Sequence, residues 1–241
     1  MPKRSRIVLG SVGALTGLLL LVVWFGNTVL IAVENSDPSR STGSPANGKL
    51  QNGRRLPTSG TNFSAYSRVG ALVGRNSVHE AVRSAVTEAY AALAASHPDL
   101  TFVYGETGWP HGGPFSPHRT HQNGLSVDFM VPVRDENGRA VPLPTAPWTR
   151  FGYGLEFDRQ GRLGNLQIDF EAMAAHLAAL EEAARAHGTG IELLILAPEF
   201  QALLWRTPAG RRLQGRFPVM ATPAWVRHDE HYHVNFRNPE G

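Results

Sequence analysis

The sequence contains no cysteine. Disulfide bonds, zinc–thiolate sites and cysteine nucleophiles are therefore excluded, and any metal must be held by histidine and carboxylate side chains. The sequence also lacks a G-x-G-x-x-G turn, a G-x-x-x-x-G-K-[ST] loop and a G-x-S-x-G elbow. Nucleotide binding and serine-hydrolase chemistry thus have no sequence support. Charged residues make up 18% of the chain, and the basic ones are scattered, so we do not expect nucleic-acid binding.

A basic tip, MPKRSR, precedes an uncharged, mostly apolar run over residues 7–26. A run of this length can cross the ~30 Å hydrocarbon core as a helix, and its basic side is expected to stay in the cytoplasm. We therefore predict that residues 1–33 form a cytoplasmic tip and an anchor in the inner membrane, with the rest of the chain in the periplasm. The alternative is a cleaved signal peptide and a soluble periplasmic protein. Trp24 and Phe25 stand where such a peptide needs small residues.

Residues 34–55 are rich in Ser, Gly, Pro and Asn, which predicts a flexible linker. Residues 56–241 then form one folded domain. Helix and strand patterns interleave irregularly there, which predicts an α+β fold with a compact, mostly antiparallel sheet and flanking helices. A capping box of Ser77 and Glu80 opens the first helix. The expected strands are 101–106, 125–133, 191–197 and 231–236, and the expected helices are 77–98, 168–188 and a short one from Pro198.

The histidines are unevenly distributed, because six of the ten lie in two short segments. They are His111, His118 and His121 in the first segment, and His228, His231 and His233 in the second. A catalytic zinc site takes three ligands from His and carboxylate and leaves a position for water. A bend at Gly124 lets His121 and Asp128 converge. His231 and His233, two apart on a strand, project from one face.

This spacing supplies His121, Asp128 and His233 as metal ligands. It places His231 and His228 beside them as general acid and base. An H-x-H pattern alone also occurs in ordinary strands, so surface or core histidines are the alternative interpretation.

The segments PHRTHQNGLSVDF and HDEHYHVNF together resemble the penicillin-insensitive murein endopeptidases. These belong to a wider group of zinc peptidases that includes lysostaphin-type enzymes and D-Ala-D-Ala carboxypeptidases. The resemblance extends loosely from about Leu56 to the end of the chain, and it implies the zinc peptidase scaffold of that group, which hedgehog proteins share. It implies one Zn²⁺ per chain, with His121, Asp128 and His233 as ligands and His228 and His231 in catalysis.

The implied activity is hydrolysis of peptide cross-links of peptidoglycan, between D-Ala and a diamino acid. One alternative is a D,D-carboxypeptidase or dipeptidase acting on stem peptides, which would need an arginine such as Arg119 or Arg227 for the terminal carboxylate. A second is a non-catalytic zinc-containing module that binds the cell wall. Many relatives are soluble and have structural cysteines, and this chain departs from them in both respects.

A Gly/Pro-rich loop leads into His121 and carries Glu106, Trp109 and His118. We predict that these three residues contact the substrate near the metal, although Trp109 could equally pack within the loop. Asp229 or Glu230 could orient an imidazole through its second nitrogen. A surface position is expected for Glu230.

Overall fold

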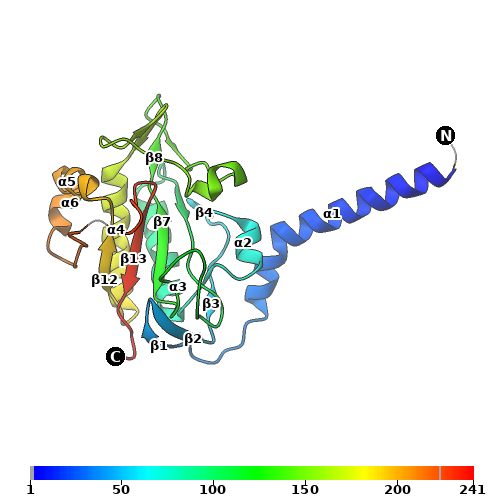
Figure 1. Cartoon of the computed structure of the whole chain (residues 1–241), viewed down its shortest axis with the longest axis horizontal. Helices are drawn as coiled ribbons and strands as arrows, with labels where there is room; N and C mark the ends of the chain where they lie inside the picture. Colours follow the sequence, from blue (N-terminus) through cyan, green and yellow to red (C-terminus); the bar gives the residue numbers. More distant parts are fainter. Residues whose placement is uncertain (1–2, 223) are drawn as a thin grey trace.

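The computed structural model describes residues 3–222 and 224–241, with side chains described from Leu15 onward. Helix α1 (Lys3–Ala32) projects from a body that the rest of the chain forms (Figure 1). Its segment Leu15–Ala32 is long and apolar enough to cross a membrane, with a mean hydropathy of 2.1. An apolar helix near the N-terminus fits either a signal anchor or a signal peptide.

A five-stranded sheet forms the centre of the body, in the order β12–β13–β7–β6–β4. Neighbouring strands run antiparallel, except that β4 and β6 are parallel. The strands are β4 (Phe63–Ala65), β6 (Phe102–Tyr104), β7 (Ser126–Met130), β12 (Ile191–Ile195) and β13 (His231–Phe236). The prediction of an α+β fold with a mostly antiparallel sheet and flanking helices is confirmed.

Helices and short strands surround this sheet. The helices are α2 (Arg68–Leu72), α3 (Glu80–Ser96), the 3-10 helix η1 (Pro147–Gly152), α4 (Phe170–Ala186), α5 (Pro198–Arg206) and α6 (Pro208–Leu213). One hairpin pairs β1 (Arg40–Ser44) with β2 (Asn47–Gln51), and β3 (Arg54–Arg55) pairs with β5 (Ser77–Val78). A small sheet contains β8 (Val133–Arg134), β9 (Ala140–Val141), β10 (Arg162–Leu163) and β11 (Leu166–Ile168).

Helices α3 and α4 pack against each other and cover one face of the central sheet (Figure 1). His176 of α4 is fully buried there, with its ring 5.0 Å from that of Tyr90 on α3 and 4.7 Å from that of Phe129 on β7. Fully burying a large apolar side chain such as Phe129 stabilises a fold by about 1.5–3 kcal/mol. The hydrophobic core therefore lies between these helices and the sheet.

Side chains on β7 and β13 alternate between the two faces of the sheet. Tyr232 and Phe129 are cross-strand partners whose rings stack 5.5 Å apart, toward the helices. The adjacent pair, His233 and Asp128, therefore points to the opposite face. That face carries a row of polar side chains, Ser126 and Asp128 on β7 and His231, His233 and Asn235 on β13. The two-residue period of the strands thus places the core side chains on one face of the sheet and the site side chains on the other.

The hairpin of β1 and β2 lies within residues 34–55, the segment predicted to be a flexible linker. Leu50 of β2 is only 2% exposed, and Ser41 Oγ donates a hydrogen bond of 2.8 Å to the carbonyl of Asn123. The linker prediction is therefore wrong for this hairpin. Its polar composition has a physical reason: the hairpin docks through hydrogen bonds onto the loop before β7, with Leu50 as its apolar contact.

His176 makes the stability of the fold depend on pH. Burial lowers the pKa of His176 to about 3, whereas a histidine in an unfolded chain has a pKa of ~6.5. Between these two pKa values the unfolded chain binds a proton at this histidine and the folded chain does not. The free energy of unfolding should therefore fall as the pH drops from ~6.5 toward ~3, by up to about 1.4 kcal/mol per pH unit. Denaturant unfolding of the full chain between about pH 7 and about pH 5 measures this slope. His176→Gln should make the slope smaller, with His118 and His228 still contributing to it. Equal slopes in both proteins would refute the assignment.

Candidate active site

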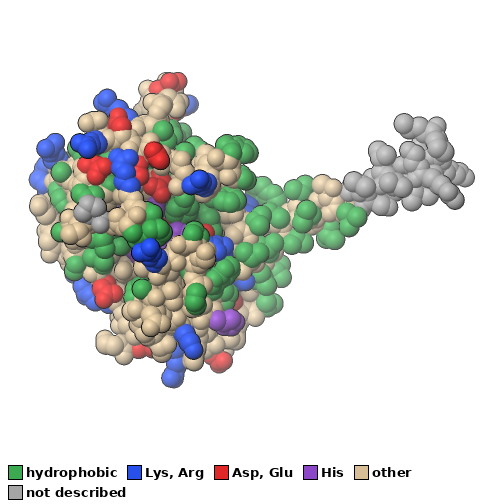
Figure 2. Space-filling view, viewed as in Figure 1, with side chains coloured by type: hydrophobic (Ala, Val, Ile, Leu, Met, Phe, Trp, Pro, Cys, Tyr) green, Lys and Arg blue, Asp and Glu red, His purple; other side chains and the backbone are tan. Residues whose placement is uncertain are grey.

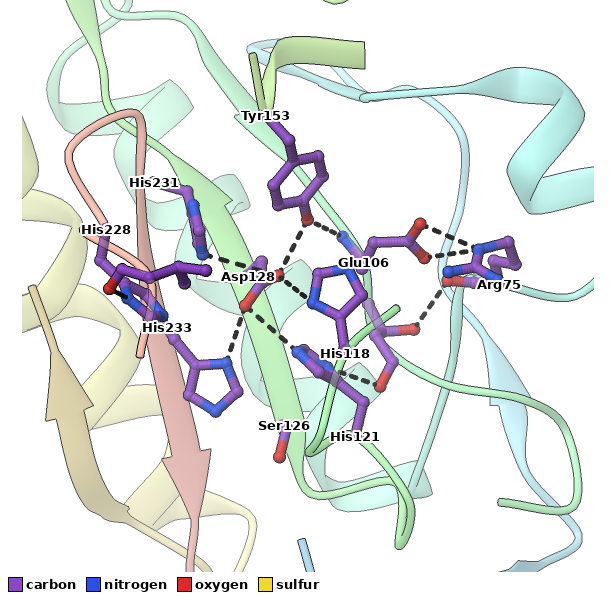
Figure 3. A network of polar contacts seen from close by, with 12 residues as sticks. Arg75, Glu106, His118, His121, Ser126, Asp128, Tyr153, His228, His231 and His233 are labelled. Atoms are coloured by element: carbon purple, nitrogen blue, oxygen red, sulfur yellow. Dashed lines mark hydrogen bonds and ion pairs between the residues drawn. The ribbon is translucent and has the colours of Figure 1, made fainter. Parts of the chain in front are cut away.

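Asp128 lies at the centre of a cluster of polar side chains on the open face of the sheet (Figure 3). Its Oδ1 lies 2.8 Å from Nδ1 of His233 and 3.3 Å from Nε2 of His121. Nδ1 of His121 donates to the carbonyl of Thr107 at 3.1 Å, so Nε2 carries the lone pair. This buried Nε2 makes no hydrogen bond in the described part of the chain. It has the orientation of a metal ligand whose other nitrogen is fixed by the protein.

The second oxygen of Asp128 faces three further side chains. Oδ2 accepts a hydrogen bond of 2.8 Å from the hydroxyl of Tyr153. It also lies 3.8 Å from Nε2 of His231 and 3.9 Å from Nδ1 of His118. One carboxylate thus joins both histidine segments, which lie more than a hundred residues apart in the sequence.

The surroundings keep Asp128 ionised. Burial would raise the pKa of Asp128, but His121 and His231 outweigh burial and hold the pKa well below its ordinary value. Burial lowers the pKa of His118 to about 4 and also lowers the pKa of His233. Burial thus favours the neutral imidazoles of His118 and His233 beside an ionised carboxylate, the state in which both groups bind metals.

His118, His121 and Asp128 could hold a metal ion, because each offers a ligand atom and these atoms lie within 4.8 Å of one another. The sequence predicts His233 in place of His118. The structure brings His233 to the same carboxylate and adds His118 to the group. A cation at this point would give the unpartnered Nε2 of His121 a partner beside a carboxylate oxygen, so the residues fit a metal.

Glu230 orients His231. Its Oε1 accepts a hydrogen bond of 2.9 Å from Nδ1 of His231, so Nε2 faces the side of Asp128. The expected surface position of Glu230 is wrong, because its side chain is only 10% exposed. Burial lowers the pKa of His231, but Asp128 and Glu230 outweigh burial and raise it above its ordinary value. The neighbouring Asp229 instead accepts from the backbone N–H of Phe157 at 2.7 Å.

His228 stands next to His231, with 4.6 Å between the ring centroids. Its Nδ1 donates to the carbonyl of Val226 at 2.8 Å. Burial is the main cause that lowers the pKa of His228 to about 4. The backbone of His228 has a φ of 53°, and that of His121 a φ of 70°. Both are in the left-handed region that non-glycine residues enter at a cost, as is common at functional sites.

A cavity of about 730 Å³ opens beside Asp128. Segments 117–121, 148–156 and 225–231 contribute most of its lining. Figure 2 shows histidine side chains in a hollow of this face, with acidic and basic side chains around it. The candidate metal group thus lies at the bottom of the cavity, and loops form the walls of the cavity.

The three predicted substrate contacts fall in different places. His118 and Glu106 line the cavity, and Glu106 also makes a two-pronged ion pair with Arg75 at 2.9 Å. Trp109 is not among the lining residues. It packs edge-on against Phe115, 5.3 Å between centroids, and lies 5.0 Å from the Arg75 guanidinium. Packing within the loop is therefore the role that the structure gives Trp109.

Tyr153 belongs to the site but was not predicted from the sequence. Besides donating to Asp128, its hydroxyl accepts from the backbone N–H of Glu106 at 2.8 Å. A Cβ at Gly105 would collide with this hydroxyl, so a glycine is needed there. The only signal in the sequence is a dense aromatic and glycine run, RFGYGLEF, which has no helix or strand period.

Removing the Tyr153 hydroxyl should weaken the site without unfolding it. Tyr153→Phe deletes the hydrogen bond to Asp128 and the one from the backbone N–H of Glu106, and it leaves the ring contacts intact. Loss of such an outer partner typically costs 10–100-fold in metal affinity or activity, so we expect roughly that loss in zinc affinity. Zinc titration with a competing chelator measures it. Tyr90→Phe on α3 serves as a control, because the buried hydroxyl of Tyr90 has no hydrogen-bond partner in the described part of the chain. An unchanged affinity in Tyr153→Phe would contradict the role.

The fold and the site can be compared with known proteins. A search of curated proteins finds no match to the chain. Residues 41–146 match a family model described as penicillin-insensitive murein endopeptidase. The matched range contains His118, His121 and Asp128 and ends before the second histidine segment. The comparison supports a peptidoglycan hydrolase and confirms, over residues 41–146, the predicted resemblance to the penicillin-insensitive murein endopeptidases.

Proposed function

We propose that the protein is a zinc-dependent murein endopeptidase that hydrolyses the peptide cross-link between D-Ala and a diamino acid. The observation that carries this proposal is the carboxylate of Asp128, which contacts side chains of both histidine segments in one cavity. Such convergence of imidazoles on a buried carboxylate is typical of a metal centre. The family description supplies the substrate class.

The ligands that we propose are His121, Asp128 and His233, with His118 as a fourth side chain in reach of the same carboxylate. Zinc held there would polarise the scissile carbonyl and lower the pKa of water toward ~7. The absence of cysteine leaves nitrogen and oxygen as the available ligand atoms.

The remaining polar groups handle the proton. Hydrolysis places the hydroxyl of water on the carbonyl carbon and a proton on the leaving amine. Glu230 fixes the proton on Nδ1 of His231, so Nε2 can take a proton from the water and pass it to the amine. His228, 4.6 Å away, flanks this transfer, and Tyr153 holds Asp128 in place.

A carboxypeptidase acting on free peptide ends is the second candidate function. Of the two arginines predicted for its terminal carboxylate, Arg227 is already paired with Glu199 and Asp229 at 2.9 Å. Arg119 lines the cavity and stacks over the ring of Trp225 at 4.9 Å. Arg119 is therefore the residue that favours this second function.

Digestion of purified muropeptides by the full chain decides between these functions. Conversion of cross-linked dimers to monomers with zinc, and not with a chelator, is the result expected of an endopeptidase. Release of D-Ala from monomers, abolished in Arg119→Ala, would favour the carboxypeptidase. A folded, zinc-loaded chain that cleaves neither substrate would refute both and favour a binding module.

Two exposed tryptophans flank the cavity and should bind the substrate. Trp148 is 87% exposed and Trp225 is 55% exposed, and both line the cavity. Losing one stacking contact costs about 0.5–1.5 kcal/mol, so Trp148→Ala and Trp225→Ala should each raise KM for dimers roughly 2–10-fold, with kcat nearly unchanged. Steady-state kinetics measures this, with Trp109→Phe as the control outside the cavity. An unchanged KM in both variants would exclude the tryptophans from substrate binding.

A further inference from the structure

One face of helix α1 packs against the body of the protein. From Val23 onward, buried or half-buried positions recur every three or four residues, whereas residues 15–22 are exposed. The recurring residues are Val23, Gly26, Asn27, Leu30, Ile31 and Glu34. This spacing is that of a single helix face. The last part of α1 is therefore packed against the body, and the part before it is not.

Asn27 of α1 completes a buried hydrogen-bond network inside the body. Its side chain is 2% exposed. Nδ2 donates to the carbonyl of Leu56 at 3.0 Å, and Oδ1 accepts from Nδ2 of Asn76 at 3.1 Å and from the guanidinium of Arg55 at 3.4 Å. A buried amide is costly unless it is paired. Here the helix and the body satisfy each other, which a leader that is later removed has no reason to do.

The contact continues along α2. A Cβ at Gly26 would lie 2.6 Å from Leu72 Cδ1, so the glycine lets the two helices approach closely. The guanidinium of Arg68 stacks over the ring of Trp24 at 4.1 Å. Val69 of α2 is 55% exposed, and Val73, which caps the C-terminal end of α2, is 58% exposed. Val69 and Val73 each directly follow a residue that contacts α1, Arg68 and Leu72 respectively.

We take the uncharged run, rather than the most hydropathic window Leu15–Ala32, as the part of α1 that crosses the membrane. Residues 7–26 carry no charge, and as a helix they span about 30 Å, the thickness of the hydrocarbon core. Trp24 then falls at the membrane boundary, where tryptophan is enriched. With this span, Arg68, which stacks on Trp24, would lie at the level of the lipid phosphates.

We propose that α1 is retained as a structural part of the domain, and that the face of α2 with Val69 and Val73 rests in the surface of the lipid bilayer. This inference rests on the membrane anchor predicted from the sequence. It goes beyond the tether, because a tether through a flexible linker would leave the body free to move. Here α1 enters the body without a linker and holds the cavity at one height above the membrane.

The contact between α1 and the body is also connected to the candidate metal group by a chain of hydrogen bonds. Asn76, which binds Asn27, forms a bridge with Gly108, and Ser77 accepts from Thr107 Oγ1 at 3.0 Å. The carbonyl of Thr107 holds His121. Hence the end of α1 and the candidate metal ligand share one rigid support.

Two measurements on the full chain test the proposal. The first is the intact mass of the chain purified from the membranes of an expressing bacterium, which should be that of an unprocessed chain. The second uses the absence of native cysteine. Val69→Cys, Val73→Cys and, as a control on the opposite end of the body (Figure 1), Arg212→Cys on α6 are labelled with an environment-sensitive dye. The labelled chains are then reconstituted in vesicles of phosphatidylethanolamine and phosphatidylglycerol.

The dye at residues 69 and 73 should emit at shorter wavelength in vesicles and be quenched by brominated lipid, whereas the dye at residue 212 should do neither. A chain cut after α1 would overturn the retention of the helix. Equal emission and quenching at all three positions would overturn the bilayer contact. Neither readout requires peptide cleavage, so failure of the proposed endopeptidase activity would be seen separately.

Discussion

Replacing His233 with alanine is expected to remove zinc and to abolish cleavage of cross-linked muropeptides. Nδ1 of His233 lies 2.8 Å from Asp128 Oδ1, so the substitution deletes one of three proposed ligands. A catalytic zinc site takes three protein ligands, and of the proposed set only His121 and Asp128 would remain, so we expect stoichiometric zinc binding to be lost. Zinc content after dialysis and the rate of dimer cleavage measure the two losses.

A surface histidine provides the control for this experiment. His97→Ala changes an exposed residue at the end of α3 and should keep both zinc and activity. The unfolding transition of His233→Ala must resemble that of wild-type protein from which zinc has been removed. A His233→Ala variant that kept full zinc occupancy would show that the ligand set is wrong, with His118 as the obvious replacement.

Replacing His231 with glutamine is expected to preserve zinc and to lower kcat. Nε2 of His231 lies 3.8 Å from Asp128 Oδ2, at the edge of the metal group. Because this imidazole moves the proton in the proposed reaction, its loss should lower kcat by about 10²–10⁴-fold. Glutamine can still hydrogen-bond Glu230, so the buried carboxylate keeps a partner.

Glu230→Gln is a matched variant in which we expect an intermediate loss of kcat. It keeps a hydrogen-bond acceptor for His231 and removes the negative charge that helps to raise its pKa. We expect a smaller loss of kcat than in His231→Gln, and a pH profile shifted to lower pH. Zinc loss in His231→Gln would move His231 from proton transfer to metal binding and contradict the assignment.

Local periodicity predicts the parts of the site that lie on strands. His231 and His233 share a face because strand residues alternate, and Gly124, with a φ of 74°, makes the bend before β7. The pairing of His233 with Asp128 in adjacent strands could not be read from spacing, because register depends on the whole sheet. The two segments do meet at Asp128 in the structure, and their ligand roles remain a prediction.

Residues supplied by remote loops were not predictable in this way. Tyr153 follows a 3-10 helix and reaches Asp128 only because Gly105 leaves room for its hydroxyl. Glu230 is a charged residue next to a histidine, and its burial depends on the hydrogen bond to His231. Neither fact has a signature in residue spacing.

Two elements of the fold also differ from what the sequence predicts. The helix predicted from Ser77 begins at Glu80, because Ser77 is held in β5 and His79 caps the helix through Nδ1 to the N–H of Ala81. Polar, glycine-containing residues 40–51 were expected to be a linker, but tertiary hydrogen bonds order them as a hairpin. In both cases a contact with a distant segment outweighed a local preference.

The coordination of zinc in the full chain tests the central claim most directly. X-ray absorption at the zinc edge, with metal analysis of wild type and Asp128→Asn, reports the number of ions and their ligand atoms. The proposed site predicts one zinc per chain, bound only by nitrogen and oxygen at about 2.0–2.2 Å, and a loss of that zinc in Asp128→Asn. A folded wild-type chain that binds no stoichiometric zinc, or an Asp128→Asn variant with an unchanged zinc spectrum, would contradict it.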